Sequence, residues 1–438
     1  MYPLLVAMNL RGTAMANNTE VVASEPFLAH EKRKSISLIF CRFICVFLLA
    51  VAACYLFVSN FSSWIRETET VNEQEMVNIR PLMKELEVKE QQFLKEEVCD
   101  LSVGKWIPKA EGPSYTDETC DYMADYTNCL KNGRPDRGFL HWKWQPNGCD
   151  LPPFDPLKFL NAMRNKSFAL IGDSVFRNHA RSLLCLLSVV AKADEIYHDR
   201  TNSGIFYYSE YNFTIYDIWS PFLVSYKLEK YLPELELYVD VLDSQWTKNY
   251  DKYDYMLMSG SHWFYRRAVI YENNKIIGCH YCPDLDLKNI DTDVPYRKAL
   301  ELTFKFITAS EHKPFVVLRT WSPNHFEDGE FPGSRICNKT EPFKEGEING
   351  DPADLLMRSV EIEEFEKAAA IGEKNGLRIE LLDTYHLSLL RPDGHPGAYR
   401  NYHPFDGGKK NVDNDCIHWC VPGPIDTWSE LLMKIVIP

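Results

Sequence analysis

Two short segments carry side chains that together could perform acyl transfer. In the stretch 167–187 (SFALIGDSVFRNHARSLLCLL), an apolar run ends in Gly172, Asp173 and Ser174, and an amphipathic stretch follows. A serine between a parallel strand and a helix lies where open α/β sheets bind ligands, beside a helix N-terminus that stabilises negative charge. Ser174 is therefore a candidate nucleophile. The alternative, that Ser174 only caps the helix, stays open because serine is common at helix starts.

The second segment, DNDCIHWCVPGPIDTW, supplies a candidate base near the C-terminus. Asp415 and His418 are three residues apart, so one turn can bring the carboxylate to one imidazole nitrogen while the other nitrogen faces Ser174. A serine hydroxyl needs such a base, and the base needs a partner that fixes its tautomer. Cys416 and Cys420 flank the histidine, and we expect them to hold this loop rigid.

A second strand end is the candidate oxyanion site. Gly260 ends an expected strand and is followed closely by His262 and Trp263. A small residue at that edge lets a main-chain N–H reach a developing oxyanion. We therefore group these three residues, together with Gly172 and Asp173 at the first strand end, as candidate oxyanion and substrate-binding residues.

The helix after Ser174 adds two further candidates. Arg177 and Asn178 either supplement the oxyanion site or pair with Asp173 inside the first turn, and the sequence favours neither role. The nucleophile elbow of α/β-hydrolases has glycine two positions after the serine, whereas this chain has Phe176. That fold is therefore disfavoured.

The elements that must position these residues alternate along the chain. After Pro156, short apolar runs alternate with longer amphipathic stretches, which indicates an α/β domain with a mostly parallel sheet covered on both faces. The aromatic segment 206–222 is expected to be an inserted antiparallel hairpin. The expected strands are 168–171, 235–241, 255–258, 315–319 and 378–382, and the expected helices are 177–190, 296–309, 362–374 and 425–435.

The composition is that of a globular protein. The chain has 438 residues, of which 45% are apolar and 25% charged, which excludes a disordered tail, a collagen-like repeat and a polytopic membrane protein. The net charge of −14 disfavours a general attraction to phosphates, so we expect no nucleic-acid partner.

One apolar segment predicts the membrane topology. Residues 36–58 are interrupted only by Arg42 and are long enough to cross a bilayer. The basic residues 32–34 precede this segment and should stay cytosolic. A cleaved signal peptide is disfavoured because the apolar region is long for one. The expected parts are a cytosolic tail (1–35), the anchor (36–58), a lumenal stem (59–97), a Cys-rich N-terminal subdomain (98–155) and a catalytic domain (156–438).

Cysteine usage agrees with a lumenal domain. Ten of the 13 cysteines follow the apolar segment, and an even set in such a compartment indicates disulfides, although spacing alone cannot pair them. Sequons at Asn165, Asn212 and Asn338 are candidate glycosylation sites. Cys279 and Cys282 could form half of a zinc site, but no second pair with suitable spacing is present. We favour a local disulfide there and expect no metal.

These segments together resemble the plant trichome birefringence-like family, polysaccharide O-acetyltransferases related to the GDSL/SGNH esterases. The resemblance implies an SGNH/GDSL-like three-layer α/β/α sandwich in which Ser174, Asp415 and His418 are the catalytic residues. It covers the chain from about Cys99 onward. Its specific elements are the GDS block with Arg177 and Asn178, SGSHWF (259–264), LRTWSPNHFEDGEF (318–331), LRPDGHPG (390–397) and DCIHWCVPGP (415–424).

The same resemblance implies four disulfides. If Cys129 pairs with Cys420, the early loop region is tied beside the catalytic loop, at a nominal chain-entropy gain of roughly 5 kcal/mol. Reduction should then lower activity as well as stability. The implied pairs are Cys99–Cys149, Cys120–Cys185, Cys129–Cys420 and Cys337–Cys416, which leaves Cys279 and Cys282.

The function implied by the resemblance is acetyl transfer to a hemicellulose, with xyloglucan as the expected acceptor. The enzyme would be a single-pass type II Golgi membrane protein that works through an acetyl-serine intermediate. No bound cofactor is expected, but an acetyl donor is required, either acetyl-CoA or another carrier. The alternatives are a mannan O-acetyltransferase, a carbohydrate acetylesterase and a noncatalytic wall-polysaccharide-binding protein.

Overall fold

The computed structural model describes residues 99–437, with gaps at 202, 229–234, 261, 328–335 and 411. All of these residues belong to one unit, Glu96–Pro438. The expected cytosolic tail, the anchor at 36–58 and the stem at 59–97 lie outside the described residues. Within the described part, no helix combines the length and apolarity that a bilayer crossing requires.

A mixed sheet with a parallel centre forms the middle of the molecule. Five of its strands run parallel to their neighbours, and the two strands at one edge are antiparallel. Among the described residues its seven strands lie in the order β13 (Ile379–Leu382), β12 (Phe315–Arg319), β9 (Tyr255–Met258), β3 (Ser167–Gly172), β6 (Phe213–Trp219), β5 (Gly204–Tyr208) and β4 (Asp194–His198).

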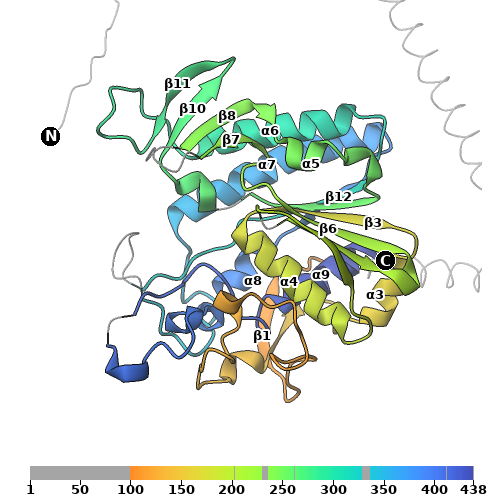
Figure 1. Cartoon of the computed structure of the whole chain (residues 1–438), viewed down its shortest axis with the longest axis vertical. Helices are drawn as coiled ribbons and strands as arrows, with labels where there is room; N and C mark the ends of the chain where they lie inside the picture. The colour runs from red at the N-terminus through yellow and green to blue at the C-terminus, as the bar shows by residue number, and fades with distance from the viewer. Residues whose placement is uncertain are drawn as a thin grey trace, which may run out of the picture. The chain divides into compact units, whose positions relative to one another are not determined.

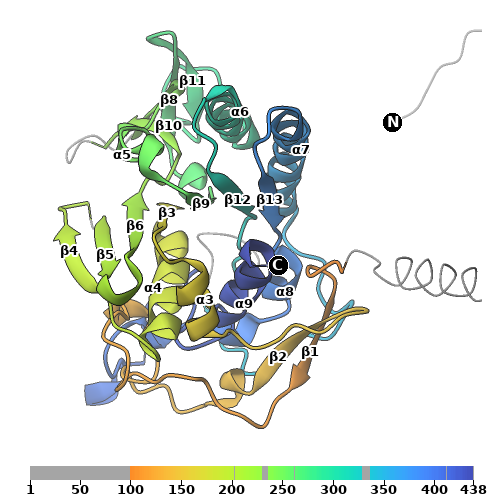
Figure 2. The same cartoon turned by 90° about the vertical axis from the view of Figure 1, so that its right-hand side faces the viewer.

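Helices cover both faces of this sheet (Figures 1 and 2). One face carries α3 (Pro156–Ala162), α4 (Ser174–Ser188) and α9 (Asp426–Val436), and the other carries α5 (Ser244–Thr247), α6 (Asp293–Ala309) and α7 (Pro352–Lys374). The short helix α8 (Tyr385–Leu389) follows β13. The four expected helices are therefore present as α4, α6, α7 and α9, and α7 begins ten residues before the expected start.

The side chains of β3 divide the core between the two faces. Phe168 and Leu170 pack in one apolar cluster with residues of α4 and α9. Ala169 and Ile171 point the other way and pack in a second cluster with residues of α6 and α7. Because both faces of the strand are buried, its sequence is a continuous apolar run, as is usual in parallel sheets.

A second, smaller sheet corrects the expected role of residues 235–241. These residues form a strand, but it belongs to a separate four-stranded sheet and not to the central one. The reason is visible in the sequence LELYV, in which buried and partly exposed residues alternate, as in a strand buried on one face only. The strand order is β11 (Lys275–His280), β10 (Ala268–Glu272), β8 (Leu235–Leu242) and β7 (Val224–Lys227).

The aromatic segment 206–222 also differs from its expected place. β5 and β6 do pair antiparallel. However, β6 is also the parallel neighbour of β3 along its whole length, from Ser167 opposite Thr214 to Gly172 opposite Trp219. The segment is therefore part of the central sheet and not an insertion.

The N-terminal region is loop-rich and held by disulfides. Its regular elements include a two-stranded sheet of β1 (Gly104–Pro108) and β2 (Trp142–Pro146). The described residues contain five disulfides, which are Cys99–Cys149, Cys120–Cys185, Cys129–Cys420, Cys279–Cys282 and Cys337–Cys416. Four of them are the pairs that the family resemblance implies, and the fifth is the local bridge favoured over a zinc site.

Candidate active site

Asp415 and His418 form a hydrogen-bonded pair. Nδ1 of His418 lies 2.8 Å from Oδ2 of Asp415. The other carboxylate oxygen accepts the main-chain N–H groups of Ile417 and His418, at 3.1 and 3.0 Å. Burial by itself would raise the pKa of Asp415, but the charge of His418 and these hydrogen bonds hold that pKa well below its usual range. The ionised carboxylate therefore fixes both the turn and the ring orientation.

The second imidazole nitrogen of His418 is available for chemistry. Burial alone would lower the pKa of His418, but the charge of Asp415 and its hydrogen bond outweigh burial and raise it. Nε2 is buried and has no hydrogen-bond partner among the described residues, although 18% of the side chain is exposed. A hydroxyl brought to Nε2 would therefore meet a base with no competing partner.

Asp173, not Ser174, caps helix α4. Oδ1 of Asp173 accepts the main-chain N–H groups of Val175 and Phe176, at 3.0 and 3.1 Å. Ser174 is the first residue of the helix and is half-buried, and its hydroxyl makes no hydrogen bond within the described residues. The interpretation of Ser174 as a cap is therefore wrong, because the preceding carboxylate already performs that task.

Asn178 connects α4 to the loop that carries His418. Its Oδ1 accepts the main-chain N–H of Trp419 at 2.6 Å, and its Nδ2 donates to the carbonyl of Trp419 at 3.1 Å. Both ends of the amide contact Trp419, so Asn178 does not pair with Asp173, while its role at the oxyanion site stays a prediction. The two hydrogen bonds hold the residue after His418 against the first turns of the helix that begins at Ser174.

Arg177 does not pair with Asp173, and its role at the oxyanion site stays a prediction. Its guanidinium donates to the carbonyl of Thr201 at 3.2 Å and lies over the ring of Trp219, 4.6 Å from the centroid. The side chain therefore points across the sheet edge toward β6 and the loop before β5, and it does not pair with the cap Asp173 of its own helix.

The end of β9 lies beside the end of β3, as expected for the oxyanion site. A Cβ at Gly260 would clash with the ring of Tyr296, so only glycine fits there. Ser259 fixes this bend, since its hydroxyl donates to the carbonyl of Gly260 and accepts from Nη2 of Arg319, both at 2.8 Å. The main-chain N–H groups of Ser174 and Gly260 make no hydrogen bond with other described residues. They are free to receive a substrate oxygen.

His262 and Trp263 begin the 3-10 helix η5 (His262–Tyr265). Nε2 of His262 lies 2.8 Å from the main-chain carbonyl of Ser322. Trp263 is half-buried, and its ring contacts that of Trp219 edge-on at 5.2 Å. Packing therefore accounts for much of Trp263, while contact of either residue with substrate stays a prediction.

A cavity of about 1150 Å³ opens next to the candidate base. Ile417, which precedes His418, lies in its wall, as do His262 from η5 and Asn324 from the segment after β12. The buried carboxylate of Asp354 also lines it and accepts from Nδ2 of Asn324 at 3.2 Å. The wall of the cavity thus combines polar and apolar groups, and Ile417 connects it to the loop of His418.

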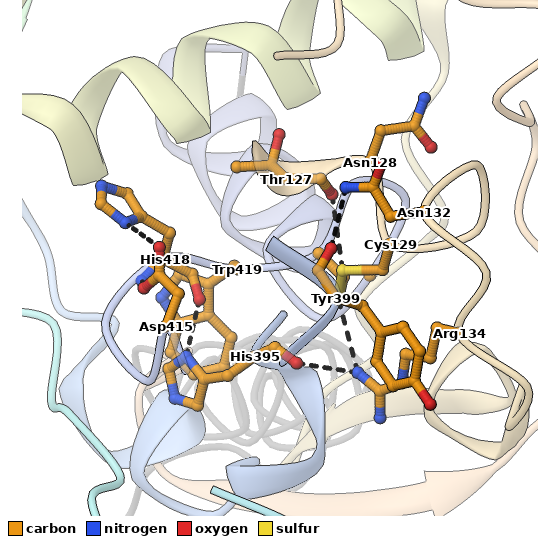
Figure 3. The surroundings of a disulfide bond; sticks show 12 residues. Thr127, Asn128, Cys129, Asn132, Arg134, His395, Tyr399, Asp415, His418 and Trp419 are labelled. Carbon is orange, nitrogen blue, oxygen red and sulfur yellow. Dashed lines mark hydrogen bonds and ion pairs between the residues drawn. A yellow bond between two sulfur atoms is a disulfide. The ribbon is translucent and has the colours of Figure 1, made fainter. Parts of the chain in front are cut away.

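Sequence reasoning missed His395 and His325, which support the loop that carries His418. Nδ1 of His395 lies 2.7 Å from the main-chain carbonyl of His418, and its ring lies over Trp419 at 4.2 Å (Figure 3). Nε2 of His395 lies 2.7 Å from Nδ1 of His325, and burial lowers the pKa of both histidines. Both stand inside the motifs LRPDGHPG and LRTWSPNHFEDGEF, but the sequence does not show that they touch.

A second support comes from the N-terminal region. Arg134 donates from Nη1 to the carbonyl of His395 at 2.8 Å (Figure 3). Its Nη2 donates to the carbonyl of Asp393, also at 2.8 Å. The side chain is buried beside the Cys129–Cys420 disulfide. Charge alone gave no signal for this residue, because only the tertiary structure brings it under the loop.

The cysteines beside His418 and the pair considered for zinc are all bonded in disulfides. Cys279 is bonded to Cys282, Cys416 to Cys337, and Cys420 to Cys129. Within the described residues, no group of three or more His, Cys, Asp or Glu side chains is arranged to hold a metal ion.

The three sequon asparagines are exposed. Asn165 and Asn212 lie next to each other, since Nδ2 of Asn212 donates to Oδ1 of Asn165 at 3.0 Å. Their modification, and that of Asn338, stays a prediction.

Two family models match the chain. Residues 151–435 match the model described as the GDSL/SGNH-like acyl-esterase family found in Pmr5 and Cas1p. Residues 97–150 match the model of the PMR5 N-terminal domain. Together they cover almost all of the described part.

Several known plant proteins are similar over most of their length. Protein trichome birefringence-like 26 of Arabidopsis thaliana is 48% identical over 343 residues, which is 77% of this chain and 77% of the relative. Xyloglucan O-acetyltransferase 1 of the same plant is 40% identical over 346 residues, 78% of this chain and 81% of the relative. Xyloglucan O-acetyltransferase 2 of Populus trichocarpa is 41% identical over 351 residues, 78% and 82% of the two chains.

Proposed function

Because the chain belongs to the GDSL/SGNH-like acyl-esterase family found in Pmr5 and Cas1p, we propose that it is a polysaccharide O-acetyltransferase with xyloglucan as its acceptor. Relatives that carry the name xyloglucan O-acetyltransferase support this acceptor. The observation that carries the proposal is the Asp415–His418 pair, whose Nε2 has no partner among the described residues and whose loop is tied by Asn178 to the helix that begins at Ser174.

In the first half of the proposed reaction, Ser174 attacks the acetyl carbonyl of the donor. His418 takes the hydroxyl proton at Nε2, and Asp415 stabilises the resulting imidazolium. The N–H groups of Ser174 and Gly260 stabilise the oxyanion, because they have no other partner among the described residues. His418 then returns the proton to the leaving group, and an acetyl-serine forms.

In the second half, a sugar hydroxyl replaces the donor. His418 removes its proton, the sugar oxygen attacks the acetyl-serine carbonyl, and the bond between that carbon and Oγ of Ser174 breaks. The proton passes to Oγ, which restores the enzyme. Two sequential displacements predict ping-pong kinetics. The cavity beside Ile417 is the proposed acceptor site, because its wall combines apolar surface with polar side chains such as His262 and Asn324, as a site for a sugar chain requires.

The proposal includes a location and a donor. The catalytic part would lie in the Golgi lumen behind the anchor at 36–58, and the five disulfides and the exposed sequons are consistent with that compartment. The acetyl donor would be acetyl-CoA or another acetyl carrier, and no resident cofactor takes part in the proposed chemistry.

A transfer assay with the full-length chain tests the proposal. The chain is incubated with an acetyl donor and deacetylated xyloglucan oligosaccharides, and mass spectrometry measures acetyl increments on the sugar. Wild type should add acetyl groups, and Ser174→Ala should give neither product nor acetyl-enzyme. Release of free acetate alone would favour an esterase, and acetylation of mannan instead would change the acceptor. Undiminished binding of xyloglucan without any acetyl-enzyme would favour a noncatalytic binding protein.

A further inference from the structure

Tyr126 reaches the candidate base from the N-terminal region. It lies in the 3-10 helix η1 (Asp125–Thr127). Its ring centroid is 5.0 Å from that of His418, and the two planes meet at 72°, an edge contact. A residue that belongs to the PMR5 N-terminal domain match thus forms part of the wall around the candidate base.

Two cross-links hold this wall in place. The main-chain N–H of Val421 donates to the carbonyl of Thr127 at 2.9 Å. Two residues further on, Cys129 is bonded to Cys420 (Figure 3). Because both links join the neighbours of Tyr126 to the neighbours of His418, the two backbone segments that carry the ring and the imidazole are held side by side.

The hydroxyl of Tyr126 is free to meet a ligand. It makes no hydrogen bond within the described residues, and it is not among their buried polar atoms that lack a partner. Burial of the ring raises the pKa of Tyr126, and the charges of Arg177 and Asp415 also act on that pKa. The phenol is therefore neutral, and it lies near the charged side chains of Arg177 and Asp415.

The ring makes the surroundings of the base unfavourable for water. Nε2 of His418 has neither solvent contact nor a hydrogen-bond partner within the described residues. An ordered water needs two to four polar partners, and the edge of the Tyr126 ring offers none. Removing the ring would expose the base and make room for water molecules that hydrogen-bond to one another.

We propose that Tyr126 decides whether the acetyl-enzyme reacts with a sugar hydroxyl or with water. This inference rests on the acetyl-transfer function proposed above. In both routes His418 removes a proton from the attacking oxygen, the new C–O bond forms, the bond to Oγ of Ser174 breaks, and the proton passes to Oγ. The ring of Tyr126 excludes the water, and its hydroxyl hydrogen-bonds to the acceptor sugar.

The test measures what share of the acetyl groups passes from the enzyme to sugar and what share passes to water. The full-length chain receives p-nitrophenyl acetate as donor and xyloglucan oligosaccharides as acceptor. Released p-nitrophenol reports acetyl-enzyme formation, and mass spectrometry reports acetylated sugar. In Tyr126→Ala, the share of acetyl groups that reaches sugar should fall about tenfold, while p-nitrophenol release changes much less. In Tyr126→Phe, the share should be kept at saturating acceptor, but the KM for the oligosaccharide should rise.

The control is Tyr402→Ala, because Tyr402 is 68% exposed and lies outside the site. In this variant, the share of acetyl groups that reaches sugar should equal that of wild type. An unchanged partition in Tyr126→Ala would overturn the role of the ring, and an unchanged acceptor KM in Tyr126→Phe would overturn that of the hydroxyl. If the Ala variant does not fold, the Phe variant still decides the second point. A wild-type chain that releases p-nitrophenol but acetylates no sugar would instead overturn the proposed function itself.

Discussion

The side-chain amide of Asn178 makes two hydrogen bonds with the main chain of Trp419, one at each end of the amide. The two residues are 241 positions apart. Asn178 lies one turn after Ser174, and Trp419 follows His418 directly. The amide therefore ties the first turns of the helix that begins at Ser174 to the loop that carries His418.

Asn178 should act by positioning the base. In Asn178→Ala, the loop can move away from α4, and a displacement of about 1 Å can lower the rate about 10²-fold. We expect kcat for acetyl transfer to fall by that order, with a smaller change in the acceptor KM. Steady-state kinetics of the purified chain measures both. The control is Asn161→Ala, an exposed amide on α3, and an equal loss in both variants would refute the positioning role.

Asp415 should set the pH dependence of the reaction. His418 acts as a base only when neutral, and Asp415 raises its pKa, so kcat/KM of wild type should rise with pH through a value above that of an ordinary histidine. In Asp415→Asn, burial, the largest influence on the pKa of His418, loses its main opponent and lowers that pKa, so the rise of kcat/KM should move to lower pH. The loss of the correct tautomer should also reduce kcat by roughly 10³ to 10⁴.

The pH profile of kcat/KM measures this shift. A profile in Asp415→Asn that keeps the wild-type midpoint would contradict the assignment of His418 as the titrating base. A shift without any loss of kcat would contradict the role of Asp415 in fixing the tautomer.

His395 should be replaceable by asparagine but not by glutamine. The amide nitrogen of asparagine can occupy the position of Nδ1 and donate to the carbonyl of His418, whereas that of glutamine corresponds to Nε2, which faces His325. We therefore expect His395→Asn to keep more of the wild-type kcat than His395→Gln does. Kinetics at matched protein stability checks this order, and the reverse order would show that the contact with His325 matters more.

The Cys129–Cys420 disulfide should matter more than the local one. It joins residues 291 positions apart, whereas Cys279–Cys282 spans three. In the chain-entropy picture the long link is worth roughly 5 kcal/mol. The double variant Cys129→Ser/Cys420→Ser should therefore lower both Tm and kcat, since the His418 loop loses its tie. Cys279→Ser/Cys282→Ser is the matched control, and a similar loss of activity there would contradict a specific role for the long link.

Glu361 should make stability depend on pH. It is fully buried, accepts from the main-chain N–H of Trp321 at 2.6 Å, and burial raises its pKa to about 8. Between its ordinary value and about 8, only the unfolded chain loses this proton, so the contribution of Glu361 to stability falls as pH rises through that range.

Thermal unfolding of Glu361→Gln at about pH 5 and about pH 8 measures this effect. Relative to wild type, the variant should gain Tm on going to the higher pH, because its amide does not titrate. Glu366→Gln, an exposed position on the same helix, should show no such pH-dependent difference. If the Tm of wild type and that of Glu361→Gln change equally between the two pH values, Glu361 is already ionised in the folded protein.

Local patterns predicted several elements well. The strand β3 is predictable because burial on both faces gives a continuous apolar run. The helix α4 is predictable because burial on one face gives an amphipathic pattern. The pair Asp415 and His418 was also predictable, since three residues of one turn suffice to join them. By contrast, residues 235–241 are a strand by the same rules, and their alternation indicates one buried face, yet nothing local shows which other strands complete their sheet.

The sequence by itself determined which residues can do chemistry and which short elements present them, because side-chain type and local periodicity act within a few residues. Only the tertiary structure decided what surrounds those residues. Asn178 became a link to Trp419, and Tyr126 became a wall beside His418. Such pairings depend on how segments far apart in the sequence pack together, which the strand order and the long disulfide determine. Many packing arrangements satisfy the same local preferences, so the sequence pattern does not select one of them.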